Sequence, residues 1–267
     1  MATTLTPPSG LKLVALDIDD TLIPWHGTLA KETIDAIRTV HSAGIEVVLA
    51  SGRGVYDVVP VVVELGIDDA WALCSNGSVT VQVRDGVATE AARIAFDPRG
   101  IVAALRVMDP EAPVAIETSG LGFLVDGEPF GGQAPHVVGG LAELPSEVSF
   151  LSIGSSRLST ERLLATCDDA PVHVVPYPHD GWVTLDIVSA AAGKGAALAA
   201  LAAELGIDAS QCAAVGDYLN DIPMLEWAGW SVAMGQAPQA VRDVADVVVA
   251  SSADHGAAQA LLAIAAS

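Results

Sequence analysis

Residues 12–24 read KLVALDIDDTLIP, and this stretch decides how the rest of the chain is interpreted. The apolar run Leu13–Leu16 is typical of a strand buried on both faces of a parallel sheet, and the acidic sequence DIDDT follows it. Residues i and i+2 of an extended segment point the same way, so Asp17 and Asp19 can face one reacting atom. Buried carboxylates require nearby positive charge. With two of them, one can attack phosphorus while the other handles the proton of the leaving group.

The composition limits the class of partner. The chain has 267 residues, 51% apolar and 17% charged, which is enough for a core domain plus a smaller one. Twelve Lys and Arg stand against 33 Asp and Glu, a net charge of −21 that repels nucleic acid and anionic lipid. We therefore expect no nucleic-acid partner and no membrane partner. A phosphorylated ligand would also be repelled, so a phosphate site needs a metal ion or well-placed cations.

The cysteines and the N-terminus indicate a cytoplasmic protein. Three scattered cysteines offer neither a disulfide framework nor a CxxC pair. The opening sequence MATTLTPPSG lacks the basic start and apolar centre of a signal peptide. No apolar stretch reaches the roughly 18 residues that a membrane span requires.

Strands and helices alternate in the first and last thirds of the chain, which predicts a doubly wound parallel sheet of Rossmann-like α/β type. In the first third, helices are expected over 29–43 and 55–65, and strands over 45–50 and 71–74. In the last third, a helix is expected over 194–205 and a strand over 211–215.

The middle of the chain follows a different pattern. A hairpin is expected over 79–95, and then a helix followed by two strands occurs twice. This order predicts an inserted α+β domain with an open antiparallel sheet. We expect the core domain to comprise residues 1–79 and 186–267, and the insert to comprise residues 80–185.

Further polar residues stand at the ends of the expected strands or the start of a helix. Ser51 could hold a phosphoryl oxygen, although a Ser-Gly pair is often only a turn. Lys194 begins a helix, where the macrodipole disfavours a cation, although a surface lysine is the ordinary alternative. Asp217, Asn220 and Asp221 suit either a helix N-cap or oxygen ligands for Mg²⁺.

Taken in order, these motifs resemble those of the haloacid dehalogenase-like phosphohydrolases. The insert between the serine and lysine motifs resembles that of the subgroup with a large α/β cap, the Cof-type phosphatases. The matching segments are DIDDTL, SGR, SNG, GKGAAL, GDYLNDIPML and VAMGQAP. The resemblance implies a Rossmann-like core with an inserted cap domain that closes over the substrate.

The resemblance also implies catalytic and metal-binding roles. Asp17 would be the nucleophile that forms an aspartyl-phosphate, and Asp19 would protonate the leaving oxygen and then activate water. Mg²⁺ would be held by the carboxylate of Asp17, the backbone carbonyl of Asp19 and Asp217. Asp221 would orient or indirectly support the metal.

The remaining implied roles concern the phosphoryl group and the substrate. Ser51 and Lys194 would grip the transferring phosphoryl group, with Gly52 and Asn220 beside it. Arg53 is a candidate for substrate binding at the mouth of the site. His179 and Trp182 are cap candidates, although an exposed turn is the plainer interpretation of the loop around His179.

Three segments depart from the family pattern. Asp20 stands where a glycine is usual, and we expect its carboxylate to point away from the metal or to bind a metal-bound water. Gln236 replaces a more usual asparagine. Residues 251–256, SSADHG, match the usual acidic loop only loosely, and His255 has no assigned role.

The implied function is Mg²⁺-dependent hydrolysis of a small phosphorylated metabolite by a monomer or homodimer. Two alternatives remain open at this point. A phosphomutase would form the same phospho-aspartate and return the phosphoryl group to a second hydroxyl. A non-catalytic phosphate-binding protein would be expected to lack Asp19 or Lys194, and both are present.

Overall fold

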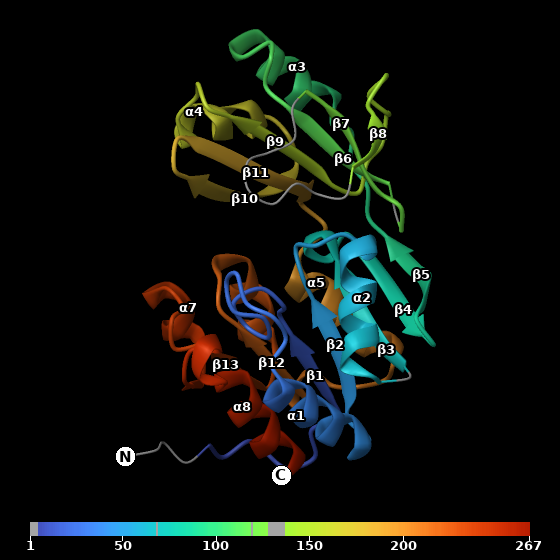
Figure 1. Cartoon of the computed structure of the whole chain (residues 1–267), viewed down its shortest axis with the longest axis vertical. Coiled ribbons are helices and arrows are strands. Elements are labelled where there is room, and N and C mark those ends of the chain that lie inside the picture. Colours follow the sequence, from blue (N-terminus) through green and yellow to red (C-terminus); the bar gives the residue numbers. More distant parts are fainter. Residues whose placement is uncertain (1–4, 68, 119, 128–136) are drawn as a thin grey trace.

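The chain forms two sheets, and they lie one beyond the other along the long axis of the molecule (Figure 1). The computed structural model describes residues 5–267 apart from residues 68, 119 and 128–136. The larger sheet has eight strands in the order β14-β13-β12-β1-β2-β3-β4-β5. These strands are β1 (Leu13–Leu16), β2 (Glu46–Ala50), β3 (Asp69–Cys74), β4 (Val79–Arg84), β5 (Val87–Arg93), β12 (Cys212–Gly216), β13 (Trp230–Ala233) and β14 (Val247–Val248).

Helices cover both faces of this sheet, as the alternating pattern predicts. One face packs against α1 (Lys31–Ser42), α2 (Val55–Leu65) and α8 (Gly256–Ala265), and the other against α5 (Lys194–Glu204), α6 (Ile222–Trp227) and α7 (Gln239–Val244). In β1, Val14 and Leu16 pack with the first group while Leu13 and Ala15 pack with the second. Burial of successive residues on opposite faces explains the uninterrupted apolar run. The strands from β14 to β3 pair in parallel, which confirms the doubly wound core.

The hairpin of β4 and β5 belongs to the larger sheet, so the boundary expected at residue 80 is wrong. β4 pairs antiparallel with β3 along its whole length. Val79, Val81 and Val83 are buried in the same cluster as α2. An antiparallel hairpin can add outer strands to a parallel sheet. The change of sequence pattern at residue 79 therefore marks the last strands of the core sheet and not the start of the insert.

The smaller sheet forms the cap and has six strands in the order β10-β11-β9-β6-β7-β8. Its strands are β6 (Val114–Thr118), β7 (Gly122–Asp126), β8 (Val137–Gly140), β9 (Leu151–Ser155), β10 (Val172–His179) and β11 (Trp182–Ser189). All pairs are antiparallel except β7 with β8. Its cap helices are α3 (Arg99–Met108) and α4 (Thr160–Leu164), and both pack on one face. The open antiparallel α+β insert is therefore confirmed in type.

The return to the core comes later than expected. β11 stays paired with β10 to Ser189, so the boundary expected at residue 186 cuts through a cap strand. The chain then enters α5 at Lys194. Short 3₁₀ turns complete the described structure: η1 (Ser75–Gly77), η2 (Ala165–Cys167), η3 (Ala209–Gln211), η4 (Leu219–Asp221) and η5 (Ser252–Asp254).

None of the helices in the described ranges combines the length and the apolar composition that crossing a membrane requires.

Candidate active site

The strand order brings four chain segments to one edge of the larger sheet. β12, β1, β2 and β3 are adjacent and parallel, so their carboxyl ends lie side by side. Asp217, Asp17 and Ser51 directly follow the first three of these strands, and η1 follows β3. Ligands of open α/β sheets bind at this kind of edge.

Lys194 connects two of the acids at the centre of this edge. Its Nζ lies 2.6 Å from Oδ1 of Asp17 and 2.6 Å from Oδ1 of Asp221. All three residues are buried, and Lys194 is only 2% exposed. The interpretation of Lys194 as a surface lysine is therefore wrong. The two carboxylates hold an ammonium at a helix start, where the macrodipole alone would disfavour it.

A close backbone approach fixes the position of this lysine. Gly193 precedes α5 with a φ of +141°, and its carbonyl oxygen would lie 2.5 Å from a Cβ placed on Gly77. Gly77 has a φ of +83°, so a larger residue would be both strained and in collision. The SNG turn after β3 therefore sets where Lys194 enters the site.

The electrostatics of the edge show a deficit of positive charge. Burial, and then the charges of Asp221 and Asp217, raise the pKa of Asp17 well above its usual value, against the opposing effect of Lys194. Burial and Asp221 also raise the pKa of Asp217 to about 7, although a hydrogen bond from Thr21 opposes this. Burial alone would lower the pKa of Lys194, but the nearby Asp17 and Asp221 raise it. Three carboxylates thus share one ammonium.

Asp221 orients the turn that carries Asp217. Its Oδ2 accepts hydrogen bonds of 2.9 Å from the amides of Asp217 and Tyr218. The carboxylate of Asp217 itself accepts a bond of 3.1 Å from Thr21 Oγ1, and no side-chain cap by Asp217 is found among the described helices. A Cβ on Gly216 would lie 2.6 Å from the Asp221 carboxyl carbon, so this position requires glycine. Asp217 therefore caps none of the described helices, and the carboxylate of Asp221 bonds the two amides that precede η4.

The same three acids form a group suited to a metal ion. Carboxylate oxygens of Asp17, Asp217 and Asp221 all lie within 4.8 Å of one another, and all three residues are buried. Oxygen ligands in this arrangement fit a hard divalent cation, which would also supply the missing positive charge. The carboxylate of Asp19 does not belong to this group.

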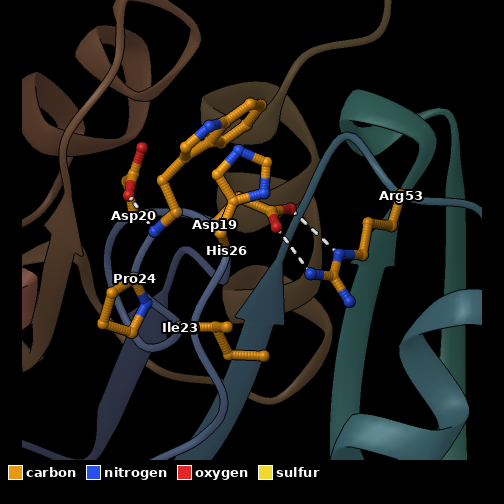
Figure 2. Close-up of a pocket in the computed structure, with 8 residues that line it drawn as sticks. Asp19, Asp20, Ile23, Pro24, His26 and Arg53 are labelled. Atoms are coloured by element: carbon orange, nitrogen blue, oxygen red, sulfur yellow. Dashed lines mark hydrogen bonds and ion pairs between the residues drawn. The ribbon is translucent and has the colours of Figure 1, made fainter. Parts of the chain in front are cut away.

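Asp19 lies at the mouth of the site with Arg53 (Figure 2). Arg53 Nε donates to Asp19 Oδ2 at 3.0 Å, and Nη2 donates to Oδ1 at 2.5 Å. A small pocket beside this pair is lined mainly by the loop 19–27. Arg53 therefore directly contacts the second acid of the DxD motif, which is formed by Asp17, Ile18 and Asp19.

Asp20 and Gln236 organise this loop. Asp20 has a φ of +57°, a left-handed conformation that glycine adopts freely and aspartate tolerates, which explains the usual glycine at this position. Its Oδ1 accepts a bond of 2.6 Å from the amide of Trp25, so the carboxylate faces the loop. Gln236 donates to the carbonyl of Asp20 at 2.5 Å and accepts from the amide of Ser252 at 3.1 Å. The substituted glutamine thus joins the DxD loop to the segment 251–256.

Ser51 is buried, and its Oγ accepts a bond of 3.1 Å from the amide of Arg53. Gly52 lies next to Asn76, whose Oδ1 would be 3.4 Å from a Cβ at Gly52. Asn220 donates to the same oxygen at 2.8 Å. The Nδ2 of Asn76 is buried without a hydrogen-bond partner in the described structure. Asn76 is a site residue to which sequence analysis assigned no role, although its place just after β3 could have indicated it.

The cap contributes two contacts to this edge. Glu117 of β6 accepts hydrogen bonds from Ser75 Oγ and, at 3.0 Å, from the amide of Val55. The rings of Tyr177 in β10 and Tyr218 in the core stack with centroids 5.9 Å apart and planes 14° apart. Trp182 lies at the start of β11, and the side chain of His179 lies outside the described part of the structure.

The sequence profile of the haloacid dehalogenase-like hydrolases matches residues 14–97 and 147–261 of the chain. The chain belongs to this family. The matched residues include the first third of the chain, which carries Asp17, and the last third, which carries Lys194, Asp217 and Asp221. The two-sheet architecture is that of the Cof-type phosphatase group.

Curated relatives and solved structures support this assignment. The phosphatase YwpJ of Bacillus subtilis is 28% identical over 93% of this chain and 98% of its own length. A phosphoglycolate phosphatase of Methanoculleus marisnigri is 30% identical over 89% of this chain and 90% of its own. A subclass IIB sugar phosphatase of known structure superposes with a TM-score of 0.74, 21% identity, and coverage of 94% of this chain and 97% of its own.

Proposed function

We propose that this hydrolase is a divalent-metal-dependent phosphatase that cleaves small phosphate monoesters through a phospho-aspartate on Asp17. The observation that carries the proposal is the buried group of Asp17, Asp217 and Asp221 with Lys194 as its nearest cation. Such a group is short of positive charge and lies where parallel strands end. A dianionic phosphoryl group requires a metal ion at this position to offset the charge.

The acids that surround this position fit Mg²⁺. Asp17, Asp217 and the backbone carbonyl of Asp19 would hold the ion, and Asp221 would support it through Lys194 and the turn amides. Bound Mg²⁺ would stabilise negative charge on the phosphoryl oxygens.

The chain's own residues would carry two successive transfers. An oxygen of Asp17 attacks phosphorus, the bond to the leaving oxygen breaks, and Asp19 gives that oxygen its proton. Asp19 then takes a proton from water, and the water oxygen attacks phosphorus and releases Asp17 and inorganic phosphate. Both carboxylate oxygens of Asp19 accept hydrogen bonds from Arg53, so this contact must loosen for one of them to reach the leaving oxygen.

The remaining side chains would hold the phosphoryl oxygens. Lys194 reaches both Asp17 and Asp221 and can donate to an oxygen of the transferring group. Ser51 and the amide of Gly52 lie at the end of the neighbouring strand, and the unpaired Nδ2 of Asn76 offers a further donor. Asn220 orients Asn76 through its side-chain oxygen. Positioning and electrostatic stabilisation of this kind account for most catalysis of phosphoryl transfer.

Phosphate release from a panel of phosphorylated metabolites, with Mg²⁺ and with EDTA, tests the proposal. Relatives named for phosphoglycolate and for pyridoxal phosphate define the size of substrate to include. Magnesium-dependent release without a bisphosphate activator supports hydrolysis over phosphomutase action. A folded, phosphate-binding protein that is inactive across the panel would instead favour the non-catalytic alternative.

A single-turnover experiment tests the intermediate. Acid quenching with a ³²P-labelled substrate should trap protein-bound label that hydroxylamine removes, as an acyl phosphate requires. Asp17→Asn should trap none. Label retained in Asp17→Asn would remove Asp17 as the nucleophile.

A further inference from the structure

One face of cap strand β11 is directed to the site. Leu185 and Ile187 pack with α3 and α4 on the far side of the cap sheet, where α3 lies at the end of the molecule remote from the core (Figure 1). Side chains alternate along a strand, so Trp182, Thr184 and Asp186 lie on the opposite face.

Tyr177 connects this face to the catalytic edge. It pairs in register with Thr184 and therefore shares its face. Its ring stacks on Tyr218, the residue that follows Asp217 in the chain. Burial, followed by the charges of Asp186, Asp17 and Asp221, raises the pKa of Tyr177 well above its usual value. The phenol thus lies in the electric field of both Asp186 and the catalytic carboxylates.

Asp186 is a carboxylate without a cation. Its hydrogen bond within the described structure is a contact of 3.0 Å from Ser152 Oγ, and none of the ion pairs among the described residues includes it. Burial raises the pKa of Asp186 to about 7, with the Ser152 bond opposing the shift. A desolvated acid with spare acceptor sites is costly unless a ligand or a proton satisfies it.

Trp182 presents the complementary group. Its Nε1 is buried and has no hydrogen-bond partner in the described structure. Trp182 and Asp186 are four residues apart, roughly 13 Å along an extended strand. A ligand that contacts both must accept at one end and donate at the other. Hydroxyl groups do both, whereas an ammonium satisfies Asp186 alone and a carboxylate or phosphate satisfies Trp182 alone.

We propose that Trp182 and Asp186 form a leaving-group subsite in the cap that accepts uncharged, hydroxyl-bearing groups and excludes leaving groups with a second negative charge. The inference rests on the proposed phosphatase function, because the subsite acts on the part of a phosphate monoester that departs. The selectivity has two sources. Asp186 accepts from a hydroxyl, and its charge repels an anion across a site that burial has partly desolvated.

The test compares glucose 6-phosphate with 2-phosphoglycolate at pH 8, where Asp186 is ionised. Wild-type enzyme should show a kcat/KM at least about tenfold higher for the sugar phosphate, the size of effect expected from one charged hydrogen bond. Asp186→Asn should lower the value for glucose 6-phosphate and raise that for 2-phosphoglycolate, each about threefold or more, since the charge is removed while the shape is kept. Opposite changes for two substrates cannot come from a folding defect.

One further variant tests the contribution of the Trp182 N–H, and another serves as the control for Asp186→Asn. Trp182→Phe keeps the ring and removes the N–H. It should raise KM for glucose 6-phosphate more than for 2-phosphoglycolate, because the charge of Asp186 keeps the second anion away from the Trp182 N–H. Asp126→Asn is the matched control, because Asp126 is an exposed cap carboxylate paired with Arg106, and it should change neither substrate.

Three results would overturn the inference while leaving phosphatase activity intact. They are a wild-type preference for 2-phosphoglycolate, equal losses on both substrates in Asp186→Asn, and faster turnover of glucosamine 6-phosphate than of glucose 6-phosphate. Failure of the proposed function would look different, because neither these esters nor acetyl phosphate would then be hydrolysed.

Discussion

The carboxylate of Glu117 in the cap accepts a hydrogen bond of 3.0 Å from the amide of Val55, the first residue of core helix α2. The same carboxylate accepts from Ser75 Oγ, so one cap residue contacts the turns after both β2 and β3. A Cβ on Gly54 would lie 2.7 Å from Glu117 Oε1, which shows how closely the two parts approach. The cap is thereby connected to the loop that carries Ser51 and Arg53.

Glu117→Ala should destabilise the protein because it leaves the Val55 amide and the Ser75 hydroxyl without a buried acceptor. Each unsatisfied group costs about 1–3 kcal/mol. Urea unfolding measures the loss. Glu111→Ala is the control, since Glu111 is exposed in the cap and paired with Arg157, and such pairs contribute about 1 kcal/mol or less. Equal effects in the two variants would contradict a bridging role for Glu117.

Asp17→Asn should abolish turnover while leaving the fold intact or slightly more stable. The reason is electrostatic, because burial and the charges of Asp221 and Asp217 already disfavour the ionised form of Asp17. A neutral amide removes this repulsion and also removes the proposed nucleophile. Phosphate release and thermal unfolding of the same preparation give the result. Substantial residual activity would exclude Asp17 as the attacking group.

Lys194→Ala should reduce both activity and stability. Activity should fall by about two orders of magnitude or more in kcat/KM, typical of losing a transition-state contact. Stability should fall by about 3–5 kcal/mol, because Asp17 and Asp221 would remain buried without their cation. Lys12→Ala, at an exposed position before β1, is the control for removing a lysine. A change in kcat/KM of less than about threefold would remove Lys194 from the transition-state contacts.

Mg²⁺ should raise the melting temperature of the wild-type protein. A ligand that binds only the folded state at a concentration 100 times its Kd stabilises by about 2.7 kcal/mol. Asp217→Asn should lose most of this increase, because Asp217 belongs to the group of three acids. The comparison needs no substrate and is made by thermal unfolding with Mg²⁺ and with EDTA. An equal increase in the variant would place the ion elsewhere.

The stability of the protein should depend on the ionisation of Asp186. Its pKa is about 7 in the folded chain and near 3.8 when unfolded, so the folded form binds the proton more tightly. Stability from this group is present at low pH and is lost as pH rises through 7. Asp186→Asn should therefore gain about 1–3 kcal/mol over wild type between pH 5 and pH 8 in urea unfolding. A gain independent of pH would show that the carboxyl group titrates normally.

Local patterns in the sequence predicted the core because they depend on short-range rules. The apolar run before Asp17 must be buried on both faces, and Gly66 ends α2 with a φ of +64°, as a left-handed C-cap requires. Parallel strands align their carboxyl ends, so Asp17, Ser51 and Asp217 could be placed at one edge without coordinates. The hairpin at residue 79 was misplaced because an alternating pattern does not show which sheet a strand joins.

The sequence by itself determined the doubly wound core, the inserted cap and the edge at which the acids gather, because strand period, helix period and the order of strands and helices can be read along the chain. Only the tertiary structure decided which side chains pair across long separations. It places Arg53 on Asp19, Glu117 of the cap on Val55, and Tyr177 of the cap on Tyr218 of the core. Such contacts depend on how the cap packs on the core, and the chain separation between partners leaves no periodic signal to predict them.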